Sequence, residues 1–361
     1  MGGYNPHMSA HISRPGIFEA LAAAALFGAS TPLAKLLVGA VPPVLLAGLL
    51  YLGSGIGLLG WWLWRRRTGR EPREAALTQR DVPWLAGAIL AGGVVGPVLL
   101  MLALAHVPAS SASLLLNLEG VFTALLAWFV FRENFDRRIA LGMALIVAGG
   151  VVLAWPDEAA GGPSLWLLAI AGACLAWAID NNLTRKVSAG DPVQIAGLKG
   201  LLAGIANTGI ALAMGHALPG APAIVAAGLV GLLGYGVSLV LFVLALRRLG
   251  SARTGAYFST APFLGAALSL SLLREAPGLA FVGAAGLMAA GVWLHMTERH
   301  EHPHAHESLA HDHAHVHDEH HRHAHDFPWD GREPHAHFHV HAPLVHSHPH
   351  YPDLHHRHAY D

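Results

Sequence analysis

The sequence LLLNLEGVF at residues 114–122 decides the fold class, because it places the carboxylate of Glu119 near the middle of an apolar stretch. This stretch, residues 109–131, is long enough to cross a bilayer as one helix. An ionisable side chain at membrane depth is costly and marks a functional site by default. Glu119 is therefore the first candidate site residue.

The composition of the whole chain agrees with a membrane protein. Hydrophobic residues make up 53% of the 361 residues and charged residues only 12%, whereas about a quarter of the residues of a soluble domain are charged. The mean hydropathy is +0.45. The single cysteine, Cys174, allows neither a disulfide framework nor a cysteine-rich metal site. We therefore expect an all-α polytopic membrane protein, and the net charge of −1 gives no reason to expect a nucleic-acid partner.

Ten stretches of suitable length predict ten transmembrane helices, since a spanning helix needs about 20 apolar residues. They are residues 15–38, 42–64, 83–105, 109–131, 136–155, 164–187, 192–214, 221–246, 251–273 and 277–297. Prolines and glycines separate most of these stretches, as expected for connections between helices. The basic residues gather in the connections on one side, which predicts an inner (cytoplasmic) membrane protein with both termini in the cytoplasm.

The second half of the chain repeats the first. Gly92 corresponds to Gly234, and Arg132-Glu133 corresponds to Arg274-Glu275. Each half has five predicted helices, and an odd number makes the second copy enter from the opposite side. The predicted segments are a cytoplasmic N-terminus at 1–14, a first repeat at 15–155, a periplasmic linker at 156–163, a second repeat at 164–298 and a cytoplasmic tail at 299–361. Such a 5+5 inverted repeat places a solute site near the midplane, between the halves.

The helix at residues 109–131 has two polar faces. Helical spacing puts Asn117 on one face and groups Glu119 with Thr123 on nearly the opposite face. Two interpretations of Glu119 stay open. Glu119 is either a proton-coupling or cation-binding group on the solute pathway, or one partner of a structural ion pair with Lys199.

Further candidates come from the other predicted helices. Asp180 and Asn181 lie near the cytoplasmic end of residues 164–187, where Asp180 either receives a cation or only caps the helix. Prolines inside a span free a backbone carbonyl one turn earlier. The polar residues that lie near Pro32 and Pro262, and that could line a polar cavity with these carbonyls, are Ser30, Thr31, Tyr257 and Thr260.

The tail is rich in histidine. Residues 300–361 hold 22 of the 27 histidines, many of them at alternate positions. The candidate metal ligands are His311, His313, His315, His317, His335, His337, His339 and His341. Neutral imidazole binds Ni, Co, Zn and Cu, so we expect the tail to collect such ions, although no cofactor is required. The tail lacks apolar periodicity and is expected to be disordered without a ligand; a plain low-complexity extension is the alternative.

Three segments resemble the sequence motifs of a known protein family. NLEGVFTALLAWFVFRE (117–133) and TAPFLGAALSLSLLRE (260–275) resemble the two copies of the EamA-type repeat of the drug/metabolite transporter (DMT) superfamily. LFGASTPLAKLL (26–37) resembles the opening of that repeat, and the resemblance covers about residues 15–297. Glu119 stands at the glutamate of the motif and Gly120 replaces its proline, whereas Pro262 keeps the proline and Ala261 lacks the glutamate. The resemblance implies secondary transport, frequently export, of small solutes.

These observations lead to one expectation with two alternatives. We expect a proton-coupled exporter, not an enzyme, whose favoured substrate is a divalent transition metal, Ni or Co first and Zn next. Its partners are the lipid bilayer and the solute, and a homodimer is left open. The first alternative is an exporter of an organic metabolite such as an amino acid or amine, with the tail only a metal buffer. The second is a membrane-anchored metal sensor or storage protein.

Overall fold

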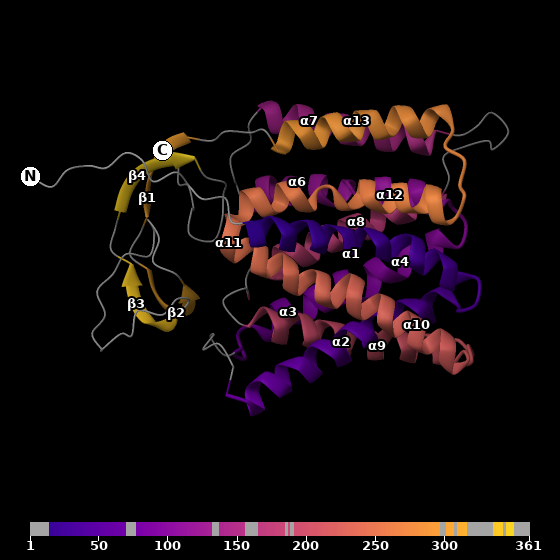
Figure 1. The fold of residues 1–361 in the computed structure, drawn as a ribbon, viewed down its shortest axis with the longest axis horizontal. Coiled ribbons are helices and arrows are strands. Elements are labelled where there is room, and N and C mark those ends of the chain that lie inside the picture. The colour runs from indigo at the N-terminus through magenta and orange to yellow at the C-terminus, as the bar shows by residue number, and fades with distance from the viewer. Residues whose placement is uncertain are drawn as a thin grey trace, which may run out of the picture.

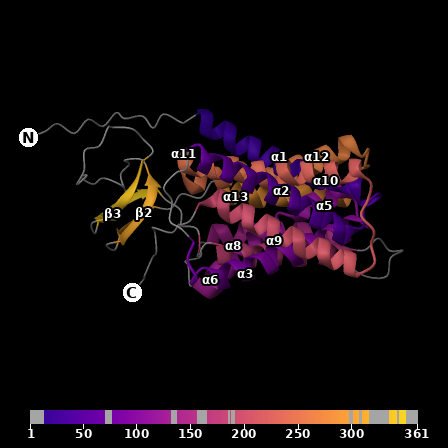
Figure 2. The same cartoon turned by 90° about the horizontal axis from the view of Figure 1, so that it is seen from below.

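The computed structural model describes residues 14–69, 77–131, 137–155, 165–184, 187, 191–296, 301–306, 309–315, 335–341 and 344–349. The predicted linker at 156–163 and nearly all of the predicted N-terminal segment lie outside these residues. The helices run along one common axis, as both Figure 1 and Figure 2 show. The start of α1 and the end of α13 lie at the same end of the bundle (Figure 1), which we call the terminal end; the opposite end is the far end.

The helices divide between the two predicted halves. The first half contains α1 (Arg14–Val38), α2 (Pro43–Arg67), α3 (Val82–Ala88), the π-helix η1 (Ile89–Val95), α4 (Gly96–Leu104), α5 (Ala109–Leu115), α6 (Leu118–Phe131) and α7 (Arg137–Ala154). The second half contains α8 (Leu165–Thr184), α9 (Pro192–Ala213), α10 (Ala221–Gly231), the π-helix η3 (Leu232–Val237), α11 (Ser238–Phe258), α12 (Ala261–Leu272) and α13 (Leu279–Met296).

The predicted membrane-spanning helices are present. In the described part of the chain, eight helical segments are long and apolar enough to cross a membrane. Two shorter apolar helices, α12 and α13, lie within the ninth and tenth predicted spans. The prediction of an all-α polytopic membrane protein is confirmed.

The predicted connection at residues 247–250 is present as a reversal of the chain, but it is helical rather than a loop. Helical hydrogen bonding in α11 continues through residues 247–250, where we expected a loop. The reason is that this segment contains no proline, whereas Pro108 ends the matching part of the first half. The chain still reverses there. The rings of Phe242 and Phe258 lie 4.8 Å apart, whereas a straight helix would separate them by about 24 Å.

The two halves are inverted with respect to each other, because matching helices pack side by side in opposite directions. Arg65, near the end of α2, bonds Asp191, just before the start of α9, with 2.8 Å between Nη2 and Oδ2. Arg138, near the start of α7, lies 5.9 Å from the ring centre of Trp293, near the end of α13. In Figure 1 the α7–α13 pair forms one edge of the bundle and the α2–α9 pair lies at the opposite edge.

Glycines allow α2 and α9 to touch through their backbones. A Cβ added at Gly200 would lie 2.8 Å from the backbone nitrogen of Gly55, and one added at Gly204 would lie 2.5 Å from the backbone nitrogen of Leu52. No side chain fits at such distances, so the small residues determine how closely the halves approach each other.

Short segments of the tail pair as strands, a feature that its composition did not predict. Strand β1 (Glu301–His306) pairs with β4 (Leu344–Pro349), and β2 (Leu309–His315) pairs with β3 (His335–His341), both antiparallel. The physical reason is the strict alternation of histidine with other residues, which has the two-residue period of a strand. The register puts His311 opposite His339 and His313 opposite His337. His317 lies outside the described residues.

The α2–α9 contact predicts the outcome of two alanine substitutions in one helix. Gly200→Ala should lower the free energy of unfolding by about 1–3 kcal/mol, because the new methyl group must push α2 away. Gly209→Ala is the matched control, since a Cβ there would meet nothing within 4 Å; it should be neutral or stabilise by about 0.5–1 kcal/mol. Thermal unfolding in detergent measures both. Equal effects would contradict the backbone contact.

Candidate functional site

The fourth predicted helix is broken near its middle. Helix α5 ends at Leu115 and α6 begins at Leu118, and the side-chain amide of Asn117 donates to the carbonyl of Leu114 at 2.8 Å. The second half has a matching break between α11 and α12. There the hydroxyl of Thr260 donates to the carbonyl of Tyr257 at 2.6 Å. At each break, the backbone N–H and the side chain of one residue, Asn117 or Thr260, both donate to the carbonyl three residues earlier. These bonds keep the carbonyl partnered at membrane depth.

Pro262 does not kink a continuous helix, as its position in the predicted span suggested. It lies in the first turn of α12, where the missing N–H has no helical partner to lose. The α1 candidates Ser30 and Thr31 are both buried, and the hydroxyl of Ser30 donates to the carbonyl of Phe27 at 2.6 Å.

Two π-helices, which the sequence did not predict, occupy matching positions in the halves. The widened turn of η1 leaves the carbonyl of Gly92 to accept hydrogen bonds from the Tyr51 hydroxyl and the Trp177 indole, each at 2.9 Å. The side-chain amide of Asn207 donates to the next carbonyl, that of Gly93, at 2.9 Å. The only sequence signal was Gly92, which recurs in η3 as Gly234.

Each π-helix packs against a polar residue of the neighbouring half. A Cβ added at Gly92 would collide with the carboxylate of Asp180 in α8, and a Cβ added at Gly234 would lie 2.6 Å from the Cβ of Ser30 in α1. Asp180 and Ser30 are thus equivalent positions of the inverted repeat. One carries a charge and the other does not.

Asp180 and Lys199 form an ion pair between α8 and α9. The Nζ of Lys199 lies 2.5 Å from Oδ1 of Asp180, and the two side chains are 17% and 11% exposed. The hydroxyl of Thr184 donates to the same Oδ1 at 2.8 Å and accepts from Lys199 at 2.9 Å. The structure thus gives Asp180 a charged partner on another helix, and this pair carries no net charge.

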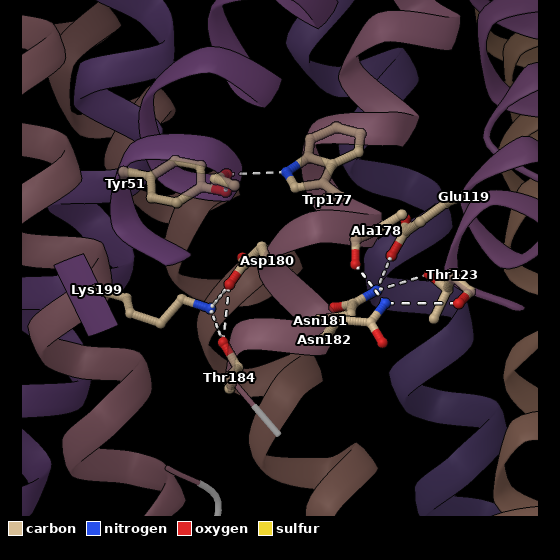
Figure 3. Close-up of polar contacts among 11 residues, drawn as sticks. Tyr51, Glu119, Thr123, Trp177, Ala178, Asp180, Asn181, Asn182, Thr184 and Lys199 are labelled. Carbon is tan, nitrogen blue, oxygen red and sulfur yellow. Dashed lines mark hydrogen bonds and ion pairs between the residues drawn. The ribbon is translucent and has the colours of Figure 1, made fainter. Parts of the chain in front are cut away.

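Glu119 has a different partner from the one we considered. The ion pair with Lys199 is wrong, because α9 turns Lys199 toward Asp180. The amide of Asn181 donates to Oε1 of Glu119 at 2.8 Å and lies 3.5 Å from the hydroxyl of Thr123. Figure 3 shows Asp180 and Asn181 on opposite sides of α8, with Lys199 on one side and Glu119 on the other. Glu119 is thus the carboxylate of this cluster whose hydrogen-bond donor is a neutral amide.

Aromatic rings join the two π-helices. The ring centres of Tyr51 and Tyr235 lie 5.5 Å apart, and those of Phe27 and Tyr235 lie 6.2 Å apart. Phe27 also lies 5.5 Å from Phe258, just before the second break. The space between the halves therefore combines aromatic faces with the polar cluster around α8. In the described residues, no three His, Cys, Asp or Glu side chains are grouped closely enough to hold a metal ion.

Comparisons with known proteins agree with this architecture. The profile described as the EamA-like transporter family matches residues 14–155 and 164–297. An "Uncharacterized transporter" of Methanothermobacter thermautotrophicus is 29% identical over 299 residues, which cover 77% of this chain and 85% of that protein. A protein of Pseudomonas fluorescens named "Probable 4-amino-4-deoxy-L-arabinose-phosphoundecaprenol flippase subunit ArnE" is 38% identical over 84 residues, 23% of this chain and 72% of its own length.

A solved crystal structure has the same fold. It superposes with a TM-score of 0.57 and covers 77% of this chain and 95% of its own, at 22% identity. At this identity the likeness shows the fold alone.

The ion pair predicts a large effect of removing its cation. Lys199→Met should lower the free energy of unfolding by about 3–5 kcal/mol, because the Asp180 carboxylate would stay buried without a charged partner. The double variant Asp180→Asn, Lys199→Met should recover most of that loss, since Thr184 can still bond the amide. Chemical or thermal unfolding in detergent measures both. A Lys199→Met variant as stable as the parent would contradict the buried pair.

Proposed function

The chain belongs to the EamA-like transporter family, and we propose that it is a proton-coupled exporter of a small cationic solute across the cytoplasmic membrane. Both termini lie in the cytoplasm in this proposal, as the distribution of basic residues predicts. The favoured substrate is a divalent transition metal, Ni or Co first and Zn next.

The observation that carries the proposal is the neutral hydrogen-bond donor beside the carboxylate of Glu119. The neighbouring carboxylate, Asp180, is matched by Lys199, whereas Asn181 offers Glu119 only a neutral amide. An ionised carboxylate at membrane depth is costly without a counter-charge. Glu119 therefore favours either a proton or a bound cation, and exchange between the two couples solute movement to proton movement.

The backbone around Glu119 suits such exchange. Glu119 follows directly on the break between α5 and α6, and its amide partner lies on a helix of the other half. Broken helices at the interface of inverted repeats are where secondary transporters bind their solutes. A movement of one half against the other would therefore change the surroundings of this carboxylate.

The tail supports a metal substrate. Its register puts histidines of β2 opposite histidines of β3, as in the pair of His315 and His335, and imidazole is a preferred ligand of Ni, Co, Zn and Cu. The tail would collect ions in the cytoplasm. Within the bundle, the ion would be held weakly by Glu119 and neighbouring amide and hydroxyl oxygens, which permits its release.

A second candidate substrate is an organic amine. The rings of Phe27, Tyr51 and Tyr235 form the aromatic surface on which an ammonium group binds through its charge. In this version Glu119 still exchanges the solute for a proton, and the tail only buffers metal. A membrane-anchored metal store, the third candidate, would bind metal without moving any solute.

Glu119→Gln tests the coupling. The variant keeps the size of the side chain but removes the exchangeable charge, so proton-driven uptake into inside-out vesicles should fall to background and lose its dependence on pH. Asp81→Asn, a change near the start of α3 away from the pathway, is the control and should transport like the parent. Normal transport by Glu119→Gln would remove this residue from the mechanism.

Removal of the tail tests the substrate. Metal-sensitive cells should accumulate less Ni and Co when they express the full chain, and truncation after residue 299 should weaken this protection by raising the metal concentration that half-saturates export. A matched tail with asparagine in place of the eight candidate histidines should behave like the truncation. Unchanged metal accumulation with the full chain would leave the organic amine as substrate, and metal retention without export would indicate a store.

A further inference from the structure

The turn between α4 and α5 at the far end is held by two charged side chains from distant parts of the chain. The Nζ of Lys35, near the end of α1, lies 2.5 Å from the carbonyl oxygen of Leu104 and 2.9 Å from that of Val107. The carboxylate of Glu275, between α12 and α13, accepts hydrogen bonds from the backbone N–H groups of Ala109 and Ser110 at 2.8 and 2.9 Å.

The charges match the helix ends that they contact. Carbonyl groups at the end of α4 present partial negative charge to Lys35, and N–H groups at the start of α5 present partial positive charge to Glu275. Lys35 belongs to the first half and Glu275 to the second. The two contacts, which we call the far-end clamp, therefore tie the second half to a turn of the first.

The backbone next to Glu275 is strained. Arg274 has a φ of 53°, and in the described part of the chain it is the one residue other than glycine with a positive φ. Side chains disfavour this left-handed conformation, and such residues occur where the surrounding structure enforces them. At Arg274 the strained backbone leads directly into the residue that bonds α5.

Below the clamp, α1, α5 and α12 meet without space between them. A Cβ added at Gly265 would lie 2.7 Å from the carbonyl oxygen of Gly28 and 2.9 Å from the hydroxyl of Ser113. Ser113 is 1% exposed. Above this contact, a cavity of about 340 Å³ is lined by Ser110, Ser111, Glu275 and Phe281, among others. These contacts leave no gap beside Ser113, and the cavity next to them is lined by Glu275 of the clamp.

We propose that Lys35 and Glu275 are the gate residues of the far end, and this inference rests on the proposed transport function. While both contacts are made, α1, α5 and α12 stay packed and the pathway is closed at this end. Release of Glu275 from α5 frees the second half to move away, which opens the route beside Ser113. Glu275 acts as a positioning residue here, since it contacts the backbone rather than the solute.

Cysteine labelling tests the gate without any transport assay. In a Cys174→Ala background, Ser113→Cys places a thiol below the clamp, and Ser111→Cys places one in the cavity above it. A membrane-impermeant maleimide is added to vesicles of both orientations; the Ser111→Cys variant reports which side the far end faces. From that side, Glu275→Ala and Lys35→Met should each raise the labelling rate at Ser113→Cys by roughly tenfold and leave the rate at Ser111→Cys unchanged.

Two further variants separate gating from structural support. Glu275→Gln retains one acceptor oxygen and should give an intermediate labelling rate. Asp191→Asn weakens a similar cap at the start of α9, where Asp191 accepts from the Val193 N–H at 2.8 Å at the terminal end, and should leave Ser113→Cys protected. If Glu275→Ala does not fold, Lys35→Met and Glu275→Gln still decide the question.

The outcomes distinguish this inference from the transport proposal. Protection of Ser113→Cys in folded Glu275→Ala or Lys35→Met protein would overturn the gate, whatever Glu119→Gln does. Increased labelling together with normal transport by Glu119→Gln would support the gate and overturn the coupling role of Glu119.

Discussion

A membrane interior offers no water to polar groups, so each free backbone group and each charge in the bundle needs a partner within the protein. The chain departs from α-helical bonding at η1, at η3 and at the two helix breaks. Side chains donate to carbonyls at these points: Tyr51 and Trp177 at Gly92, Asn117 at Leu114, and Thr260 at Tyr257. At Leu114 and Tyr257 the backbone N–H of the same residue donates as well. The polar residues of the pathway are therefore tied to the irregular backbone, and the two must change together if the halves move.

The inverted repeat supplies two equivalent sets of backbone features, one around η1 and the first break and one around η3 and the second break. Only the first set carries charged side chains. Asp180 faces η1 where Ser30 faces η3, and Glu119 follows the first break where Ala261 follows the second. Symmetric charges would create two costly sites in the membrane. The charges gather around η1, the first break and α8, where we assign the chemistry to Glu119. The surroundings of η3 and the second break can then stay neutral and serve packing.

The sequence was sufficient for those features that depend on local pattern. Apolar length gave the spanning helices, and the recurrence of Gly92 as Gly234 gave the repeat. The partner of Lys199 could not be predicted in this way. Asp180 and Asn181 are adjacent, and successive residues of a helix point about 100° apart, so the rotation of α8 decides which of them meets α9. Sequence alone leaves that rotation undetermined.

The π-helices and their donors were missed for a related reason. Tyr51 and Trp177 are distant in sequence from Gly92, and a widened helical turn has no residue signature stronger than glycine. The tail strands could not be predicted because the tail is weakly hydrophobic, although its two-residue alternation favours pairing. In each case a long-range contact decided what local pattern left open.

The pairs α2–α9 and α7–α13 each join one helix from each half, and they lie at opposite edges of the bundle. Any movement of one half against the other must therefore slide the helices of both pairs along each other at the same time. An antibody fragment or lipid-facing inhibitor that bridges α7 and α13 would block this sliding. Such a molecule would stop the transport cycle from the rim of the protein, at a distance from the polar groups to which we assign the solute.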